Sequence, residues 1–330
     1  MTVSLAPSPS LTLTYSHTVG HYSVAGRGFS NPVDLAFSSD GAAYVVSRGN
    51  PRHCDTDVRI SVCTLAEEEC FHFGAFGTAD GQFVWATSIA IDAQDRLYVA
   101  DEHRHDVQVF AKDGTFLKKW GQFGREPGQL NRPSGIAIDP NGNVVVVDHL
   151  NFRVQTFTPD GELLACWGLR GNGPGEFDLP WGVDIGPDGM VYVADWNNHR
   201  VQKLRPDGTF VQSFGVGAGR AGNGPGELNR PSSVAVDTDG VVYVADRGND
   251  RVQAFSADGA HLTTLVGDSQ LSPWAEEILV GNPDLVAERA LADLSVEERF
   301  WIPTAVAISK DGRLCVLEAG RHRIQVYARS

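Results

Sequence analysis

The side chains in this chain that could carry chemistry are two histidines, two carboxylates and two arginines: His103, His149, Asp34, Glu318, Arg48 and Arg247. An imidazole exchanges a proton near neutral pH, and a carboxylate can share that work as a general acid or base. An arginine can hold a carboxylate of a bound molecule through two parallel hydrogen bonds. These residue types suit lyase or hydrolase chemistry on a small organic molecule.

These residues belong to a sequence repeat that explains nearly the whole chain. The segment RPSGIAIDPNGNVVVVDHLNFRVQTFTPDGELLACWG (132–168) returns at 179–215 and again from Arg230, with looser copies from Trp85, Asn31 and Ile302. Each copy has an apolar run, a DPNG-type turn, a β-branched run, an alternating run and a final turn. Six such units of four short strands predict an all-β fold, a six-bladed β-propeller that occupies residues 1–330 as a single domain.

The two ends of the chain predict how the ring closes. The sixth copy stops after its third strand, near Val326 and Tyr327, and LTLTYSHTVGHY (11–22) precedes the first copy as a spare strand. Pairing the N-terminal strand into the last blade would remove two exposed sheet edges. We therefore expect this strand to complete the sixth blade.

Comparison of the copies separates repeated positions, which are expected to be structural, from singular ones. Asp101, Asp148, Asp195 and Asp246 repeat, and we expect them to orient the turn after the second strand. Singular residues are Asp34, His103, His149, Glu318 and three tryptophans, Trp85, Trp181 and Trp196. The tryptophans either form an aromatic wall for a planar ligand or fill a narrow channel. The mouth of the axial channel is expected to present Thr87, Ser134, Trp181, Ser232 and Thr304, with Val33.

One insertion separates the fifth copy from the sixth. Residues 272–301 have a helical pattern, with starts predicted at Ser272 followed by Pro273, at Asp284, and at Ser295 with Glu298. This segment either covers part of the loop-rich face as a lid or runs as a long connection along the rim.

The motif YVADWNNHRVQ, repeated as YVADRGNDRVQ, resembles the NHL repeat family, whose members include enzymes, RNA-binding proteins and protein-interaction platforms. The repeats are also distantly similar to those of peptidyl-hydroxyglycine amidating lyases, which hold zinc with three histidines that each follow a proline. Here the matching positions hold Val33, Thr87, Ser134, Trp181, Ser232 and Thr304, so the zinc ligands are missing. The resemblance also implies a structural calcium near Pro32-Val33-Asp34, with Asp34 as a ligand. The alternative is that Asp34 accepts hydrogen bonds from neighbouring amides.

Composition limits the partners. The net charge of −14 disfavours nucleic acid and anionic membrane surfaces. The first residues lack a secretory signal pattern, and the 5 cysteines lack framework spacing, so we expect a cytoplasmic protein. Two functions remain open: an enzyme acting on a small molecule in the axial funnel, or a non-catalytic propeller that binds a protein or glycan. The sequence leaves the oligomeric state undetermined.

Overall fold

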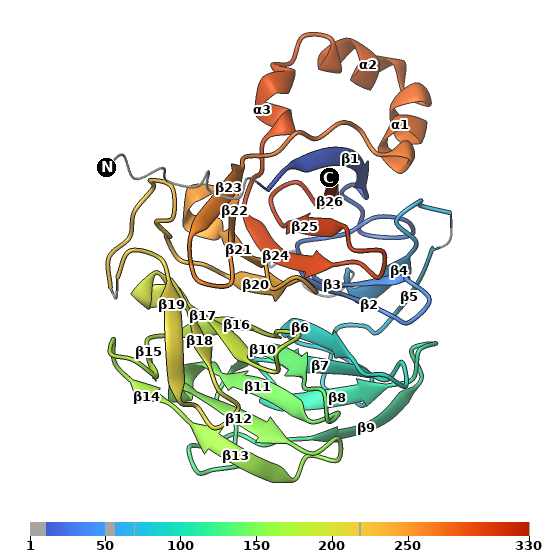
Figure 1. The fold of residues 1–330 in the computed structure, drawn as a ribbon. Coiled ribbons are helices and arrows are strands. Elements are labelled where there is room, and N and C mark those ends of the chain that lie inside the picture. The colour runs from blue at the N-terminus through green and yellow to red at the C-terminus, as the bar shows by residue number, and fades with distance from the viewer. Residues whose placement is uncertain (1–10, 50–56, 69, 218, 330) are drawn as a thin grey trace, which may run out of the picture.

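Six four-stranded antiparallel sheets surround a central axis (Figure 1). The computed structural model describes residues 11–49, 57–68, 70–217 and 219–329. The innermost strands of neighbouring sheets contact one another all the way round, from β2 through β6, β10, β16, β20 and β24 back to β2. The predicted six-bladed propeller is confirmed. Within the described ranges, no helix is long and apolar enough to cross a membrane.

Each blade contains one copy of the repeat, with its strands in chain order from the axis outward. Blade 1 consists of β2 (Pro32–Phe37), β3 (Ala43–Arg48), β4 (Val58–Cys63) and β5 (Cys70–Phe73). Blade 2 consists of β6 (Ala86–Ile91), β7 (Leu97–Asp101), β8 (Asp106–Phe110) and β9 (Phe116–Trp120). Blade 3 consists of β10 (Pro133–Ile138), β11 (Val144–Asp148), β12 (Arg153–Phe157) and β13 (Leu163–Trp167).

The last three blades follow the same order. Blade 4 consists of β16 (Pro180–Ile185), β17 (Val191–Asp195), β18 (Arg200–Leu204) and β19 (Phe210–Phe214). Blade 5 consists of β20 (Ser233–Val236), β21 (Val242–Asp246), β22 (Arg251–Phe255) and β23 (His261–Leu265). Blade 6 consists of β24 (Pro303–Ile308), β25 (Leu314–Glu318), β26 (Arg323–Arg329) and the N-terminal strand β1 (Leu13–Val19). The short strands β14 (Leu169–Arg170) and β15 (Glu176–Phe177) pair in the linker before blade 4.

The ring closes through β1, which pairs antiparallel with β26 from Leu13 opposite Arg329 to Val19 opposite Ile324. This confirms the predicted closure by the N-terminal strand. Val19 is fully buried in a core cluster that also contains residues of blades 1 and 6. Because each edge strand would otherwise expose unpaired backbone groups, the pairing protects both ends of the ring at once.

The apolar core lies between blades. One cluster joins Tyr44 and Ile60 of blade 1 to Ile89 and Leu97 of blade 2, and another joins Tyr192 of blade 4 to residues of blade 5. Each blade therefore supplies one side of the interface with each of its two neighbours. Its apolar faces are buried only when those neighbours are in place.

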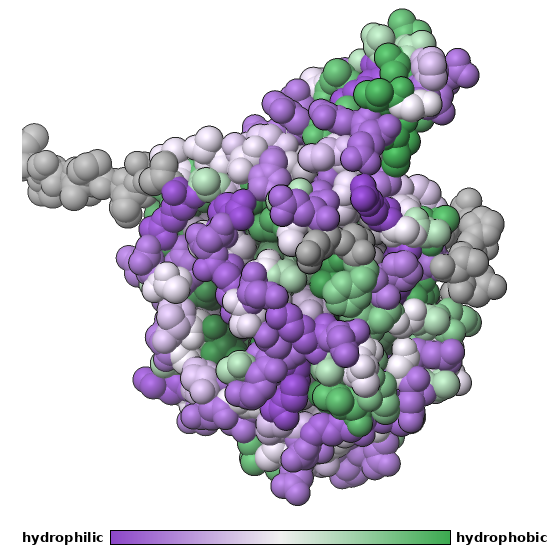
Figure 2. All heavy atoms as spheres, turned by 90° about the vertical axis from the view of Figure 1, so that its right-hand side faces the viewer, coloured by the Kyte–Doolittle hydropathy of each residue, from purple (hydrophilic) through white to green (hydrophobic). Residues whose placement is uncertain are grey.

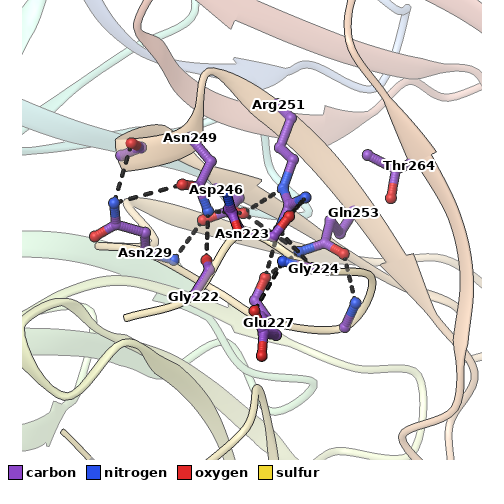
Figure 3. Close-up of polar contacts among 12 residues, drawn as sticks. Gly222, Asn223, Gly224, Glu227, Asn229, Asp246, Asn249, Arg251, Gln253 and Thr264 are labelled. Carbon is purple, nitrogen blue, oxygen red and sulfur yellow. Dashed lines mark hydrogen bonds and ion pairs between the residues drawn. The ribbon is translucent and has the colours of Figure 1, made fainter. Parts of the chain in front are cut away.

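A buried carboxylate ends the second strand in blades 2 to 6 and ties that strand to the linker before it. In blade 5, the backbone N–H of Asn229 donates to Asp246 Oδ1 at 2.6 Å, while Asn249 and Arg251 donate to Oδ2 at 2.8 and 2.7 Å (Figure 3). Arg251 also donates to the carbonyl of Glu227 in the linker. The side chains of Asp101, Asp148, Asp195, Asp246 and Glu318 are all fully buried.

A second repeated contact joins the loop after the second strand to the next blade. The Nδ1 atoms of His105, His199 and His322 accept hydrogen bonds of 3.0, 3.1 and 3.0 Å from the backbone N–H groups of Arg132, Arg230 and Asn31. In blade 5, the Asp250 carboxylate accepts the equivalent bond from Ile302. An imidazole can accept at Nδ1 only when that nitrogen is unprotonated, so these three junctions need neutral histidine.

The insertion forms three short helices: α1 (Pro273–Val280), α2 (Pro283–Arg289) and α3 (Leu294–Glu298). Ser272 caps α1 as predicted, whereas Asn282 caps α2 in place of Asp284 and Asp293 caps α3 in place of Ser295. These two predictions were wrong because the side-chain acceptor acts from the residue just before the first turn, which lies two positions earlier than expected in both helices.

The helices project beyond the outer strands of the ring and do not cover the axis (Figures 1 and 2). Trp274 fixes this position because its backbone N–H donates to the Glu67 carboxylate and its indole Nε1 donates to the Glu67 carbonyl, at 2.7 and 3.0 Å. Trp274 is buried in the cluster that holds Val19. Residues 272–301 thus lie beyond β1 at the outer edge of blade 6.

We expect a charge at Val19 to destabilise the whole ring. Val19→Asp places a carboxylate in the core between the first and last blades and should lower the free energy of unfolding by on the order of 3 kcal/mol. Thr14→Asp, on the exposed side of the same strand, is the matched control and should have little effect. Urea unfolding that gave equal losses for both variants would contradict the role of β1 in closure, as would an unchanged melting temperature after deletion of residues 1–22.

The histidine junctions should make the ring sensitive to acid. Burial lowers the pKa of His105, His199 and His322 below 6.5. Because the folded state then binds fewer protons than the unfolded state, stability should fall as pH drops below about 6.5. The His105→Asp/His199→Asp double variant copies the Asp250 junction and should show a shallower loss between pH 7 and pH 5 in denaturant titrations. An equal slope in wild type and variant would refute this.

Candidate functional site

A cavity of about 320 Å³ occupies the axis of the ring and is lined by the inner strands of all six blades. Two carboxylates reach it from opposite blades, Asp34 from β2 of blade 1 and Asp184 from β16 of blade 4, and Lys310 of blade 6 also lines it. Both residues line the cavity and are only partly exposed. The cavity therefore disfavours their ionised forms.

Asp34 lies where the repeat comparison placed it, in the axial channel. The Ser88 hydroxyl and the Ile89 N–H donate to its Oδ2 atom at 2.5 and 3.0 Å, which bears out the amide-bonded alternative. Burial raises the pKa of Asp34 to about 6, although these hydrogen bonds oppose the change.

The surroundings of Asp34 do not fit the calcium ion that the family resemblance implied. Calcium is held by six to eight oxygen ligands, whereas N–H and O–H donors turn their hydrogens toward the Asp34 carboxylate. In the ranges that the structure describes, no three histidine, cysteine, aspartate or glutamate side chains gather as metal ligands would.

Asp184 is a candidate that the sequence reasoning missed. The Val236 N–H donates to its Oδ2 atom at 2.8 Å, and burial together with the charge of Asp34 raises the pKa of Asp184 to about 7. The signal was present in the repeat, since the other five copies hold alanine at this position: Ala36, Ala90, Ala137, Ala235 and Ala307. The site residues predicted in the inner strands came from the second and third positions of those strands, whereas Asp184 occupies the fifth position of its strand.

Four predicted ligand-binding hydroxyls line the cavity but donate to the neighbouring blade. Thr87 donates to the Pro133 carbonyl at 3.0 Å, Ser134 to Trp181 at 2.8 Å, Ser232 to Thr304 at 2.8 Å, and Thr304 to Pro32 at 3.3 Å. Each bond crosses a blade interface near the axis. The hydroxyl hydrogens are therefore used to join blades, and only the oxygen lone pairs remain for a ligand.

The mouth of the channel brings His149, Trp181, Trp196 and Arg247 together from three blades. The ring centroids of His149 and Trp181 are 5.1 Å apart, and those of Trp181 and Trp196 are 5.9 Å apart. The Arg247 guanidinium stacks on Trp196 at 5.2 Å. His149, Trp181 and Trp196 thus form a row of rings that ends at the Arg247 cation, whereas Trp85, the third tryptophan of the predicted wall, does not belong to this row.

His149 is held in a single orientation. Its Nδ1 atom lies 2.9 Å from the carbonyl oxygen of Pro180, and a carbonyl can only accept, so Nδ1 carries the proton. In the neutral ring, Nε2 then has a free lone pair. Burial lowers the pKa of His149, which keeps the ring neutral near pH 7, while the Pro180 carbonyl and the Glu102 charge partly oppose this.

Arg48, Trp85 and His103 form a second group between blades 1 and 2, where they line a hollow of about 340 Å³. Arg48 Nε donates to the Ala86 carbonyl at 2.8 Å, and its Nη2 atom lies 3.3 Å from Glu102 Oε2. Trp85 contacts Arg48 at 5.9 Å and His103 at 6.4 Å. The two groups adjoin, since the Arg48 charge acts on Arg247 and the Glu102 charge acts on His149.

Glu318 does not join either group. It accepts hydrogen bonds from the Trp301 N–H, Arg323 Nε and Gln325 Nε2 at 2.8, 2.7 and 2.8 Å. These contacts are those of the repeated aspartates, with the longer side chain in the same place. Glu318 is singular in the sequence only because glutamate stands where the other copies have aspartate, and we leave it out of the candidate site.

Comparisons with solved structures show propellers of low sequence identity. A streptogramin B lyase superposes with a TM-score of 0.59 at 11% identity, covering 97% of this chain and 98% of that one. A catalytically inactive virginiamycin B lyase from Staphylococcus aureus with quinupristin gives 0.58 at 13% identity, covering 97% and 88%. A protein of unknown function from Bacteroides thetaiotaomicron gives 0.66 at 18% identity, covering 97% and 77%. These likenesses concern the fold.

Sequence comparisons match individual repeats. Protein brain tumor from Drosophila melanogaster is 41% identical over 49 residues, 15% of this chain and 5% of that protein. NHL repeat-containing protein 3 from Homo sapiens is 52% identical over 40 residues, 12% of each chain. The NHL repeat model matches residues 83–110, 130–157, 177–204, 228–255 and 300–327, which are the linkers and first three strands of blades 2 to 6. The chain therefore contains NHL repeats in five of the six blades of its β-propeller.

Proposed function

We propose that this propeller binds a small organic molecule at the channel mouth and catalyses a lyase- or hydrolase-type reaction on it by proton transfer. One observation carries the proposal: His149 has a fixed imidazole whose Nδ1 is held by the Pro180 carbonyl and whose Nε2 atom has a free lone pair, and it lies against Trp181, which lines the axial cavity. A general base must be unprotonated at working pH and positioned beside its substrate.

The surrounding groups suit this role. The Trp181 and Trp196 rings offer a flat apolar surface, and Glu102 would stabilise the imidazolium that forms when His149 accepts a proton. Asp34 and Asp184 hold protons up to about pH 6 and pH 7, so the cavity also contains carboxylic acids that could return a proton. The lyases with similar folds support a propeller that acts on small molecules.

The alternative is a non-catalytic propeller that binds a protein or glycan. Tyr22, Phe76 and Phe123 occupy equivalent positions at three blade junctions and expose 50%, 39% and 63% of their surface. Trp85 is also exposed. An open arc of aromatic side chains would suit a large partner, because stacking on such rings needs no enclosed pocket.

Substitutions at the mouth should separate these functions. A thermal-shift screen of small acids, alcohols and sugars should find ligands that raise the melting temperature by at least about 2 °C. His149→Ala and Trp181→Ala should lose that response, because each removes one wall of the site. Trp301→Ala, an exposed tryptophan of the insertion, is the control and should keep it. Binding that is confined to macromolecules and insensitive to the mouth variants would reject the enzyme.

Asp184→Ala should stabilise the protein at neutral and alkaline pH. The folded-state pKa of about 7 lies above the unfolded value, so the folded state binds more protons and stability falls as pH rises from about 4 to about 7. The variant, which restores the alanine of the other blades, should lose this slope and gain on the order of 1 to 2 kcal/mol at pH 8.

Chemical denaturation across this pH range measures the slope, with the exposed turn variant Asp207→Ala as control. Equal slopes in wild type and Asp184→Ala would mean that Asp184 ionises freely.

A further inference from the structure

Arg48 and Arg247 occupy equivalent repeat positions in blades 1 and 5, and they lie close enough for the charge of Arg48 to act on Arg247. Arg48 ends β3 in blade 1, and Arg247 directly follows β21 in blade 5. Blade 6 lies between them and holds Ala319 at the same position of its repeat, so the shortest side chain of this ring stands between the two longest.

Within the described ranges, a single carboxylate, that of Glu102, pairs with one of the two cations. Arg48 Nη2 lies 3.3 Å from Glu102 Oε2, so the two residues form an ion pair, but Nη2 makes no hydrogen bond. Among the described residues, Arg247 has a stacking contact with Trp196 and neither an ion pair nor a side-chain hydrogen bond. Burial and the charge of Arg48 both lower the pKa of Arg247, and only Asp250 opposes them. The free protein therefore holds an uncompensated cation beside another cation.

Stacking also determines what Arg247 can bind. The Arg247 Cζ atom lies over the Trp196 ring, 5.2 Å from its centroid, and a guanidinium in such a cation–π contact keeps N–H donors for other acceptors. Two of those donors match the two oxygens of a carboxylate, which would accept two parallel hydrogen bonds. The same row of rings continues through Trp196 to Trp181, next to His149.

We propose that the ligand of this mouth is a small carboxylate with a flat apolar group, its anionic end held by Arg247 and Arg48 and its flat part lying on Trp181. This inference rests on the function proposed above and names the class of molecule. The protein carries a net charge of −14, so the attraction must come from these two residues at short range and not from the overall field.

Pairs of a carboxylic acid and its amide test whether the ligand is a carboxylate. Phenylacetate and mandelate should bind at least about tenfold more tightly than phenylacetamide and mandelamide, measured by quenching of tryptophan fluorescence and by thermal shift. Arg247→Gln should abolish this preference, and Arg247→Lys should restore part of it because the charge returns without the two-pronged donor. Arg321→Gln is the matched control, since Arg321 stacks on Trp301 at 5.7 Å in the adjacent blade.

A second measurement needs no ligand. Arg247→Gln removes the repulsion between the two cations and should raise the melting temperature of the free protein, whereas an arginine with a structural partner would destabilise on removal. Acids that bind no better than their amides, or a free variant that is less stable than wild type, would overturn the carboxylate inference and leave the site intact. If neither acids, amides nor neutral compounds bind in a manner dependent on His149 and Trp181, the proposed function itself fails.

Discussion

The structure depends on a buried carboxylate at the end of the second strand in five of its blades. A buried charge is costly unless it is paired and fully hydrogen-bonded, so each carboxylate must collect its donors. In blade 5, Asp246 gathers a backbone N–H of the linker, the Asn249 amide and the Arg251 guanidinium, and Arg251 reaches on to the linker carbonyls (Figure 3). The strand, its loop and the segment entering the blade are thereby fixed as one unit.

The residue after this carboxylate always lies at the channel mouth, and it is the position at which the blades differ. It is Glu102, His149, Trp196, Arg247 and Ala319 in blades 2 to 6. Since the preceding acid holds the backbone, the side chain can change without loss of the fold. A repeated scaffold thus presents five different side chains at nearly the same radius, which is how a protein of similar blades can hold an asymmetric site.

The positive and negative charges of this site lie at different depths along the axis. Two cations lie near the mouth, where Arg48 pairs with Glu102 and Arg247 has no ion pair among the described residues, while two acids with raised pKa values lie in the cavity. Both arrangements cost stability in the free protein, because like charges are held together in partly enclosed space. Charged groups that lower the stability of the folded protein in this way are characteristic of functional sites.

The sequence by itself determined the ring, its number of blades and its closure by β1, because hydrophobic periodicity and turn residues act locally and recur in every copy. It also brought His149, Trp181, Trp196 and Arg247 to one mouth, since equivalent positions of a closed repeat share one radius. The tertiary structure decided the rest. Glu318 proved to be a structural acid once its donors were in place, burial in the closed ring raised the pKa of Asp184, and the contacts of Trp274 with Glu67 fixed the start of the helical insertion. These outcomes depend on contacts between distant segments, which no local pattern encodes.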